Sequence, residues 1–212
     1  MTTIPRSGAD VLGLAPVLPV VVLSDAEAAV PLARALVAGG VPGVEVTLRT
    51  PAALSAIERI AAEVPDAVVG AGTVATAEQA EAAAKAGARF LVSPGCTPDL
   101  ATAMIDTGLP FLPGVATVSE ALALLERGIT EMKFFPAEAA GGVPFLKSLG
   151  GPLPQVRFCP TGGITPASAP TYLALPNVGC VGGSWLAPAG LVAAGDWDAV
   201  TALAREAASL ER

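Results

Sequence analysis

The sequence predicts an α/β protein in which eight strand–helix units close into a (β/α)8 barrel of the TIM type, led by a short N-terminal helix. Short apolar segments alternate with alanine-rich segments of helical periodicity along the chain. The apolar segments start about 20 to 27 residues apart, which is the length of one strand–helix unit. Hydrophobic residues make up 52% of the 212 residues and charged residues 15%, which is typical of a globular protein with a large core.

The expected strands are short, apolar and rich in β-branched or aromatic residues. Strands covered by helices on both faces have this composition, because neither face meets water. They are residues 17–22, 44–47, 67–71, 90–93, 111–113, 132–134, 157–161 and 178–182.

The expected helices fill the intervals between these strands. They are residues 25–38, 52–63, 77–86, 98–107, 119–127, 143–149, 166–173 and 197–210, after a leading helix at 7–14. Side chains that cap helix N-termini precede four of them, at Ser24-Asp25, Thr76, Thr97 and Thr165. Prolines suited to a first helical turn are Pro98 and Pro166. Glycines suited to helix C-termini are Gly39-Gly40, Gly87, Gly108 and Gly128.

No linker or low-complexity segment divides the chain, so residues 1–212 are predicted to form one domain. The alternative architecture is an open, doubly wound parallel sheet. That fold usually carries a GxGxxG motif at the start of its first helix, and this chain has none after residues 17–22.

Composition excludes several classes of function. The net charge is −7 and the basic residues are scattered, so no nucleic-acid partner is expected. The N-terminus lacks an apolar leader, and the longest apolar run, 11–23, is too short for a membrane span and contains two prolines. Three cysteines without a CxxC pair, together with the lack of histidine, argue against zinc. We therefore expect a cytoplasmic protein with reduced thiols, of which Cys159 and Cys180 are core residues.

Lys133 is the most informative residue for function. It is one of three lysines, and it lies in the apolar run MKFFP at the end of an expected strand. Burial disfavours the ammonium form of a lysine, and the neutral amine is a nucleophile that can form a Schiff base with a carbonyl. The alternative is a strand-end lysine whose stem packs while its amine reaches water.

A second set of polar side chains lies on the expected strand 44–47 and just after it. Glu45, Thr47 and Arg49 alternate with apolar residues and therefore share one face. A carboxylate inside a barrel is costly unless it is paired or used, which makes Glu45 a candidate general base. The alternative is a purely structural ion pair of Glu45 with Arg49 or Lys133.

Two pairs of glycines follow the last two expected strands. They are Gly162-Gly163, directly after Thr161, and Gly182-Gly183, directly before Ser184. Barrels of this type usually bind phosphate in these two turns, through backbone N–H groups. Neither turn contains Lys or Arg, so a phosphate would be met by amides, by Ser184 and by more distant groups.

These motifs, taken together and in order, resemble the KDPG/KHG aldolase family. That family comprises 2-dehydro-3-deoxy-6-phosphogluconate aldolases, some of which also act on 4-hydroxy-2-oxoglutarate. The resemblance extends from about residue 15 to residue 205 and covers nearly the whole chain. The motifs are EVTLRT at 45–50, GAGTV at 70–74, SPG at 93–95, KFFPAE at 133–138, CPTGGI at 159–164 and GGSW at 182–185.

The resemblance implies a homotrimeric class I aldolase with a (β/α)8 barrel, no metal and no cofactor. It assigns the Schiff-base lysine to Lys133 and the proton-shuttling carboxylate to Glu45. The implied substrate-binding residues are Arg49 and Thr73 for the pyruvate carboxylate, Pro94 and Phe135 for the pocket wall, Thr161 near the substrate, and Gly162, Gly163, Gly182, Gly183 and Ser184 for the phosphate.

The implied ligands are a 2-keto-3-deoxy (phospho)sugar acid and pyruvate. Cleavage would give pyruvate and glyceraldehyde 3-phosphate, or pyruvate and glyoxylate from 4-hydroxy-2-oxoglutarate. Some members carry an arginine in the first strand, where this chain has Val17, Leu18 and Pro19, and this difference bears on phosphate specificity more than on aldol chemistry.

Three alternatives remain open from the sequence. The first is an aldolase for a related sugar acid such as the galactonate epimer. The second is an isomerase or synthase that uses only the glycine turns for phosphate and has no need of Lys133. The third is a non-catalytic barrel on the same scaffold.

Overall fold

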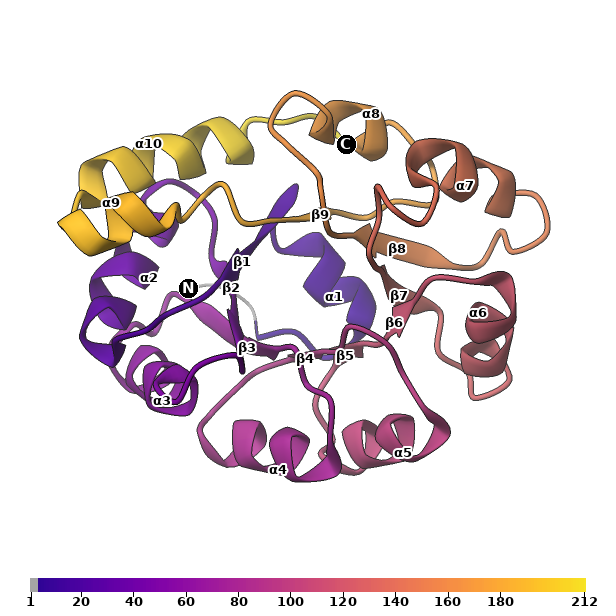
Figure 1. The fold of residues 1–212 in the computed structure, drawn as a ribbon, viewed down its shortest axis with the longest axis horizontal. Helices are drawn as coiled ribbons and strands as arrows, with labels where there is room; N and C mark the ends of the chain where they lie inside the picture. The colour runs from indigo at the N-terminus through magenta and orange to yellow at the C-terminus, as the bar shows by residue number, and fades with distance from the viewer. Residues whose placement is uncertain (1–3) are drawn as a thin grey trace.

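A ring of parallel strands lies at the centre of the structure, and helices surround it (Figure 1). The computed structural model describes residues 4–212. Residues 1–3, which belong to the N-terminal stretch inspected for a leader, lie outside the described range. The predicted α/β barrel is confirmed by this arrangement of parallel strands and alternating helices.

The strands pair in two groups, ordered β5-β4-β3-β2-β1-β9 and β6-β7-β8. Every pair is parallel. The strand bounds are β1 Val17–Val21, β2 Gly43–Thr47, β3 Val68–Gly72, β4 Leu91–Val92, β5 Phe111–Leu112, β6 Gly114–Val115, β7 Glu131–Phe134, β8 Arg157–Pro160 and β9 Val181–Gly183.

The two groups of strands form one ring, which has eight strand positions within residues 4–212. Two features explain this closure. β5 pairs with β4 and β6 pairs with β7, and only Pro113 separates β5 from β6, so the two short strands share one position. β8 and β9 meet through isolated bridges, Phe158 to Val178 and Thr161 to Gly182. The prediction of one strand at 111–113 is therefore corrected to two short strands around a proline.

Helices lie outside the ring, with the exception of α1. Within residues 4–212, no helix is both long and apolar enough to cross a membrane. The bounds are α1 Gly8–Gly13, η1 Ala26–Ala28, α2 Ala29–Ala38, α3 Ala53–Glu63, α4 Ala77–Lys85, α5 Pro98–Asp106, α6 Val118–Leu125, α7 Gly142–Leu149, α8 Ala169–Leu173, α9 Ala189–Ala194 and α10 Trp197–Ala208.

Capping explains where several helices begin and where the prediction was wrong. Thr76 and Thr97 accept hydrogen bonds from N–H groups in the first turns of α4 and α5, as expected from the sequence. Thr165 does not cap α8, because Thr165 and Ser168 hydrogen-bond each other in a turn that precedes the helix. The expected helix 25–38 begins as a 3-10 turn capped by Asp25. α9 was not predicted from the sequence.

α1 closes the amino-terminal end of the ring. It contacts β5, β7 and β8, and Gly8 lies against Glu131 at the start of β7. Leu12 lies against Gly179, just before β9. Side chains from α1 and the strands fill the interior above this helix, and the predicted core positions of Cys159 and Cys180 are confirmed, with both thiols buried. The opposite, carboxyl-terminal end therefore remains as the place for a site.

Candidate active site

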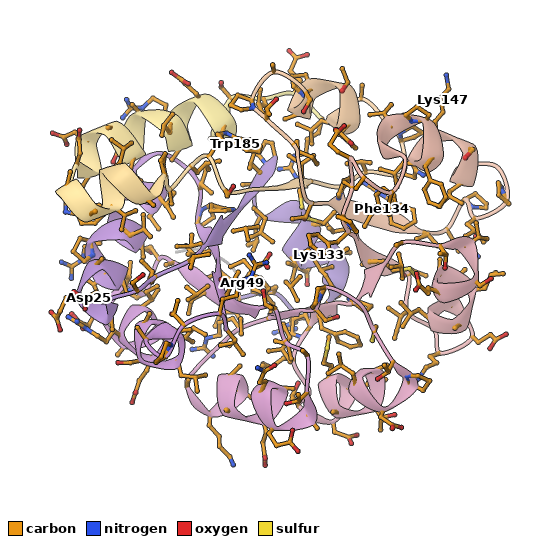
Figure 2. All side chains as sticks on the ribbon, in the orientation of Figure 1. Asp25, Arg49, Lys133, Phe134, Lys147 and Trp185 are labelled. Carbon is orange, nitrogen blue, oxygen red and sulfur yellow. The ribbon has the colours of Figure 1, made fainter. Side chains whose placement is uncertain are left out.

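Lys133 and Glu45, from two strands of the ring, form a buried ion pair. Figure 2 shows Lys133 within the ring. The Lys133 Nζ lies 3.3 Å from Oε1 of Glu45, and the two side chains are 3% and 1% exposed. Lys133 comes from β7 and Glu45 from β2, so the fold brings together residues that are 88 positions apart. The amine does not reach solvent, which excludes the surface-lysine alternative. Both interpretations of Glu45, a purely structural ion pair and a general base, are consistent with this contact between Glu45 and Lys133.

Glycine on the neighbouring strand makes room for Glu45. Gly72 ends β3 beside Thr47 of β2, and a side-chain carbon at Gly72 would overlap the Glu45 carboxyl group. Thr47 is fully buried, and its hydroxyl donates to the Val21 carbonyl over 2.9 Å, so Thr47 binds the barrel wall rather than a ligand. The predicted shared face therefore divides into one inward carboxylate and one structural hydroxyl.

Arg49 reaches back over the mouth of the barrel to Thr73. Its Nε donates to the Thr73 hydroxyl over 3.0 Å, and its two Nη groups have no hydrogen bond to any residue within 4–212. Thr73 adopts φ +57°, a left-handed conformation that is uncommon for a residue other than glycine. Arg49 and Lys133 both lie within the ring in Figure 2. The guanidinium is thus held by one nitrogen while its fork can bind a carboxylate.

The opposite wall of the site follows β4 and β7. Phe135 comes directly after β7, and its ring centroid lies 5.5 Å from the Lys133 Nζ. Pro94 follows Ser93, whose buried hydroxyl accepts a hydrogen bond from the Gly114 N–H over 3.1 Å. A side chain at Gly114 would overlap the Pro94 backbone. Ser93 and Gly114 therefore fix the place of Pro94. Ser93 is part of the SPG motif noted in the sequence, but that motif does not indicate its bond to Gly114, because packing of this kind has no sequence signature.

The first glycine turn follows β8. Gly162 and Gly163 both have positive φ, +103° and +82°, which side chains rarely adopt. Their N–H groups have no acceptor within residues 4–212. Successive free N–H groups in a turn form a concavity that suits an anion. A side-chain carbon at Gly162 would lie 3.3 Å from the Phe135 ring, so this turn adjoins the wall beside Lys133.

Gly182 and Gly183 form the end of β9 and lie beside the first glycine turn. Gly182 bridges to Thr161, and a side chain at Gly182 would overlap the Thr161 hydroxyl. Gly183 similarly leaves room for the Trp185 ring. Ser184 is exposed, and neither its N–H nor its hydroxyl bonds to another residue within 4–212. The prediction of a second turn is therefore corrected, because Gly182 and Gly183 are paired with β1 as part of β9. The structure nevertheless brings both glycine pairs together at the carboxyl-terminal end of the ring.

Two of the three cysteine thiols are disfavoured as nucleophiles because their pKa values are raised. The Cys159 thiol beside it, together with burial, raises the pKa of Cys180 well above its ordinary value, so this thiol stays protonated. Burial also raises the pKa of the Cys96 thiol. Within residues 4–212, no three His, Cys, Asp or Glu side chains are grouped as a metal site would require.

A separate cleft of about 930 Å³ lies at the amino-terminal end of the barrel. Leu12 of α1, Arg157 at the start of β8, and Arg212 are among the residues that line it. None of the predicted site residues lines this cleft. It is therefore distinct from the arrangement around Lys133.

Comparison with known proteins agrees with the geometry. Residues 9–203 match the family model for KDPG and KHG aldolase. The KHG/KDPG aldolase of Escherichia coli strain K12 is 54% identical over 201 residues, which cover 95% of this chain and 94% of that protein.

Two solved structures have nearly the same fold. The 2-keto-3-deoxy-6-phosphogluconate aldolase of Zymomonas mobilis ZM4 with 3-phosphoglycerate is 52% identical with a TM-score of 0.93, covering 98% of this chain and 97% of that one. The KDPG aldolase of Legionella pneumophila, with pyruvate captured as a covalent carbinolamine intermediate, is 47% identical with a TM-score of 0.94, covering 96% and 98%.

Proposed function

Because this chain belongs to the KDPG and KHG aldolase family, we propose that it cleaves 2-dehydro-3-deoxy-6-phosphogluconate to pyruvate and glyceraldehyde 3-phosphate through a Schiff base on Lys133. The observation that carries the assignment of residues is the buried Lys133–Glu45 pair, 3.3 Å apart at the carboxyl-terminal end of the barrel. The same chemistry extends to 4-hydroxy-2-oxoglutarate, which would give pyruvate and glyoxylate.

The first step is addition of Lys133 to the keto carbon of the substrate. Glu45 lies within hydrogen-bond distance of Nζ and can accept the proton that the ammonium must lose before it attacks. The amine adds to the C2 carbonyl to give a carbinolamine. Glu45 then returns its proton to the carbinolamine hydroxyl, which leaves as water, so that an iminium ion forms and Glu45 is a carboxylate again. The iminium withdraws electrons, so the bond between C3 and C4 becomes weak.

The second step breaks that bond. A base removes the proton of the C4 hydroxyl, the C3–C4 electron pair moves into the enamine, and the aldehyde leaves. Glu45 takes this proton, directly or through a water molecule, and later returns a proton to C3. Water then hydrolyses the pyruvyl iminium and frees Lys133. With no histidine in the chain, a carboxylate is the natural general base.

The other residues bind the two ends of the substrate. We call the part of the site formed by Glu45, Arg49, Thr73 and Lys133 the pyruvate side. The phosphate side is the part formed by Gly162, Gly163, Gly182, Gly183 and Ser184. Arg49 offers its fork to the carboxylate, and the free amides and Ser184 meet the phosphate. Pro94, Phe135 and Thr161 lie between the two sides and shape the pocket.

The same proposal covers organisation and assembly. Residues 1–212 act as one aldolase domain, since strands from both ends of the chain complete one ring. A homotrimer is supported by the family resemblance and by exposed apolar side chains on the adjacent helices α5 and α6, namely Ile105, Val118 and Leu122. Three free cysteines fit a cytoplasmic location. Light scattering at micromolar concentration should give the trimer mass, and a monomer mass would contradict it.

Borohydride trapping combined with kinetics tests the function. Reduction in the presence of pyruvate should add one pyruvyl group on lysine, and cleavage should continue in EDTA. An isomerase or a non-catalytic barrel would gain no adduct. Cleavage rates on the gluconate and galactonate epimers, with and without phosphate, decide the preferred substrate. Activity lost to EDTA and restored by a divalent cation would contradict the Schiff-base proposal.

A further inference from the structure

Glu138 and Tyr172 form a hydrogen bond that the mechanism above does not use. The Tyr172 hydroxyl donates to Oε1 of Glu138 over 2.6 Å. Tyr172 lies on α8 and is 1% exposed, whereas Glu138 lies in the segment after β7. The bond therefore joins the segment that follows Lys133 to the helix that follows the first glycine turn.

Glu138 contacts that turn through both its backbone and its side chain. Its N–H donates to the Gly162 carbonyl over 3.1 Å, next to a parallel bond from Ala137 to Thr161 of 2.8 Å. A side-chain carbon at Gly163 would lie 2.6 Å from Cγ of Glu138, so the Glu138 stem occupies the space beside Gly163. Glu138 therefore contacts both glycines of the turn, Gly162 through its backbone and Gly163 through its side chain.

Tyr172 in turn fixes the Glu138 side chain. A side-chain carbon at Gly142 would lie 3.0 Å from the Tyr172 hydroxyl, so the hydroxyl is enclosed between the Gly142 backbone and Glu138. Burial, and then the bond to Glu138, raise the pKa of Tyr172 above its ordinary value. The phenol therefore remains a hydrogen-bond donor across the neutral pH range.

We infer that Glu138 and Tyr172 are positioning residues that hold the Gly162–Gly163 turn in the form that binds phosphate, and that they thereby set the preference for phosphorylated substrates. The inference rests on the proposed function. Two adjacent glycines have unusual backbone freedom, and restricting them when a ligand binds costs affinity. If Glu138 already restricts the turn, a ligand that contacts the turn binds without that loss of affinity. A ligand that does not contact the turn is unaffected.

A purely structural link makes a different prediction. If the bond only anchors α8 to the barrel, its loss lowers the melting temperature and leaves the ratio of activities on phosphorylated and unphosphorylated substrates unchanged. The ratio therefore separates the two roles.

The test compares two substrates that differ only by the phosphate, 2-dehydro-3-deoxy-6-phosphogluconate and 2-dehydro-3-deoxygluconate. In Tyr172→Phe we expect kcat/KM for the phosphorylated substrate to fall about tenfold, through KM, because a hydrogen bond to a charged acceptor is lost. On the unphosphorylated substrate kcat/KM should change less than about twofold. Calorimetric titration with 3-phosphoglycerate should show the same loss of affinity.

Three further variants complete the test. Glu138→Gln keeps the shape of the side chain and an acceptor for Tyr172, so it should recover much of the discrimination that Glu138→Ala loses. Thr171→Val is the matched control, since it removes a hydroxyl from the same helix that bonds only to the Ser168 carbonyl. We expect wild-type kinetics from Thr171→Val on both substrates.

The ionisation of Tyr172 can be measured directly by absorbance, because it is the only tyrosine in the chain. Its phenolate absorbance should appear in the folded protein only above pH 10, the usual pKa of tyrosine, and at lower pH in Glu138→Gln. Equal losses on both substrates, or no loss in Tyr172→Phe, would overturn the inference while pyruvate trapping in the wild type still supports the proposed function. A wild type that does not cleave the phosphorylated acid would overturn both.

Discussion

The pyruvate side of the barrel mouth uses buried charged side chains, whereas the phosphate side uses glycine backbone. On the pyruvate side, the Lys133–Glu45 pair is nearly inaccessible to water and is held by β7 and β2. On the phosphate side, the N–H groups of Gly162 and Gly163 lie free in a turn with positive φ. The first side contains the amine and the carboxylate that can form bonds and transfer protons, and the second contains backbone amides and the Ser184 hydroxyl.

This difference separates chemistry from recognition. A change on the pyruvate side should slow every substrate, because each one needs the Schiff base and the proton transfer. A change on the phosphate side should affect only substrates that carry the phosphate. The two sides meet at Phe135, whose ring lies 5.5 Å from the Lys133 amine and adjoins Gly162. The predictions below test whether the two kinds of effect can in fact be separated.

The largest effect is expected from Lys133→Met. This change removes the amine while keeping a flexible apolar stem, so cleavage of all substrates should fall to background and pyruvate trapping should vanish. Lys147→Met is the matched control, because Lys147 lies on the outer surface of α7 (Figure 2). Mass spectrometry of the trapped protein checks both. An adduct that survived in Lys133→Met, or that mapped to Lys85 or Lys147, would contradict the assignment.

The next effect is expected from Glu45→Gln, which keeps the shape of the carboxyl group but cannot accept a proton. If Glu45 is the proton shuttle, the rate should fall about 10²- to 10⁴-fold on both phosphorylated and unphosphorylated substrates. Exchange of the pyruvate methyl protons with deuterated water should slow equally. Trapping of pyruvate should persist at a reduced rate, since Lys133 remains but the carboxylate that accepts its proton is lost.

The structural-pair alternative for Glu45 predicts another outcome. Removing one member of a buried ion pair costs about 3 to 5 kcal/mol of stability, and activity would then fall because the protein unfolds. Melting temperature measured on the same variant distinguishes the two roles. Wild-type proton exchange in Glu45→Gln would rule out the shuttle.

The inward positions of Lys133 and Glu45 could be predicted from the sequence because these side chains break a strong pattern. Lys133 and Glu45 are ionisable residues inside apolar strands, and strand alternation indicates which way Glu45 points. Thr47 shows the limit of that reasoning, since it shares the pattern but bonds to the Val21 carbonyl. Alternation predicts the face of the strand on which a side chain lies, but it does not predict which residue that side chain contacts.

Contacts between distant segments could not be predicted in the same way. Glu138 and Tyr172 are 34 positions apart, and neither breaks a local pattern. α9 was missed because its six residues are too few to show a helical period, and α8 begins later than Pro166 suggested because Thr165 and Ser168 bond to each other. The fifth strand position is split at Pro113 because the residues before it pair with β4 and those after it pair with β7. Closure of the ring determines these pairings, and the local sequence does not show them.

A smaller effect, confined to phosphorylated substrates, is expected from Gly183→Ala. The added carbon would overlap the Trp185 ring, so the ring and the turn must move. Overpacking of this kind costs about 1 to 3 kcal/mol, and we expect kcat/KM for the phosphorylated substrate to fall about tenfold. Tryptophan fluorescence should report the movement of Trp185.

Gly190→Ala is the control for Gly183→Ala. A carbon at Gly190 meets no atom within 4 Å, and alanine suits the interior of α9, so neither substrate should be affected. Equal losses on phosphorylated and unphosphorylated substrates in Gly183→Ala would show that the two sides of the mouth are not independent.

The smallest effect is expected from Ser184→Ala. Ser184 is exposed and its hydroxyl bonds to no residue within 4–212, so its removal should leave the melting temperature unchanged. One hydrogen bond to a charged phosphate contributes about 1.5 kcal/mol at the lower end of its range, which corresponds to about a tenfold loss on the phosphorylated substrate. The unphosphorylated substrate should be cleaved at the wild-type rate.

Ser148→Ala provides the control for this variant, because the Ser148 hydroxyl bonds to the Phe145 carbonyl of its own helix. Side-by-side kinetics on both substrates measure the ratio directly. A loss in Ser184→Ala that is the same with and without phosphate would place Ser184 near the reacting carbons. The boundary between the two sides of the mouth would then lie between Gly183 and Ser184, and the glycine amides would have to bind the phosphate without a side chain.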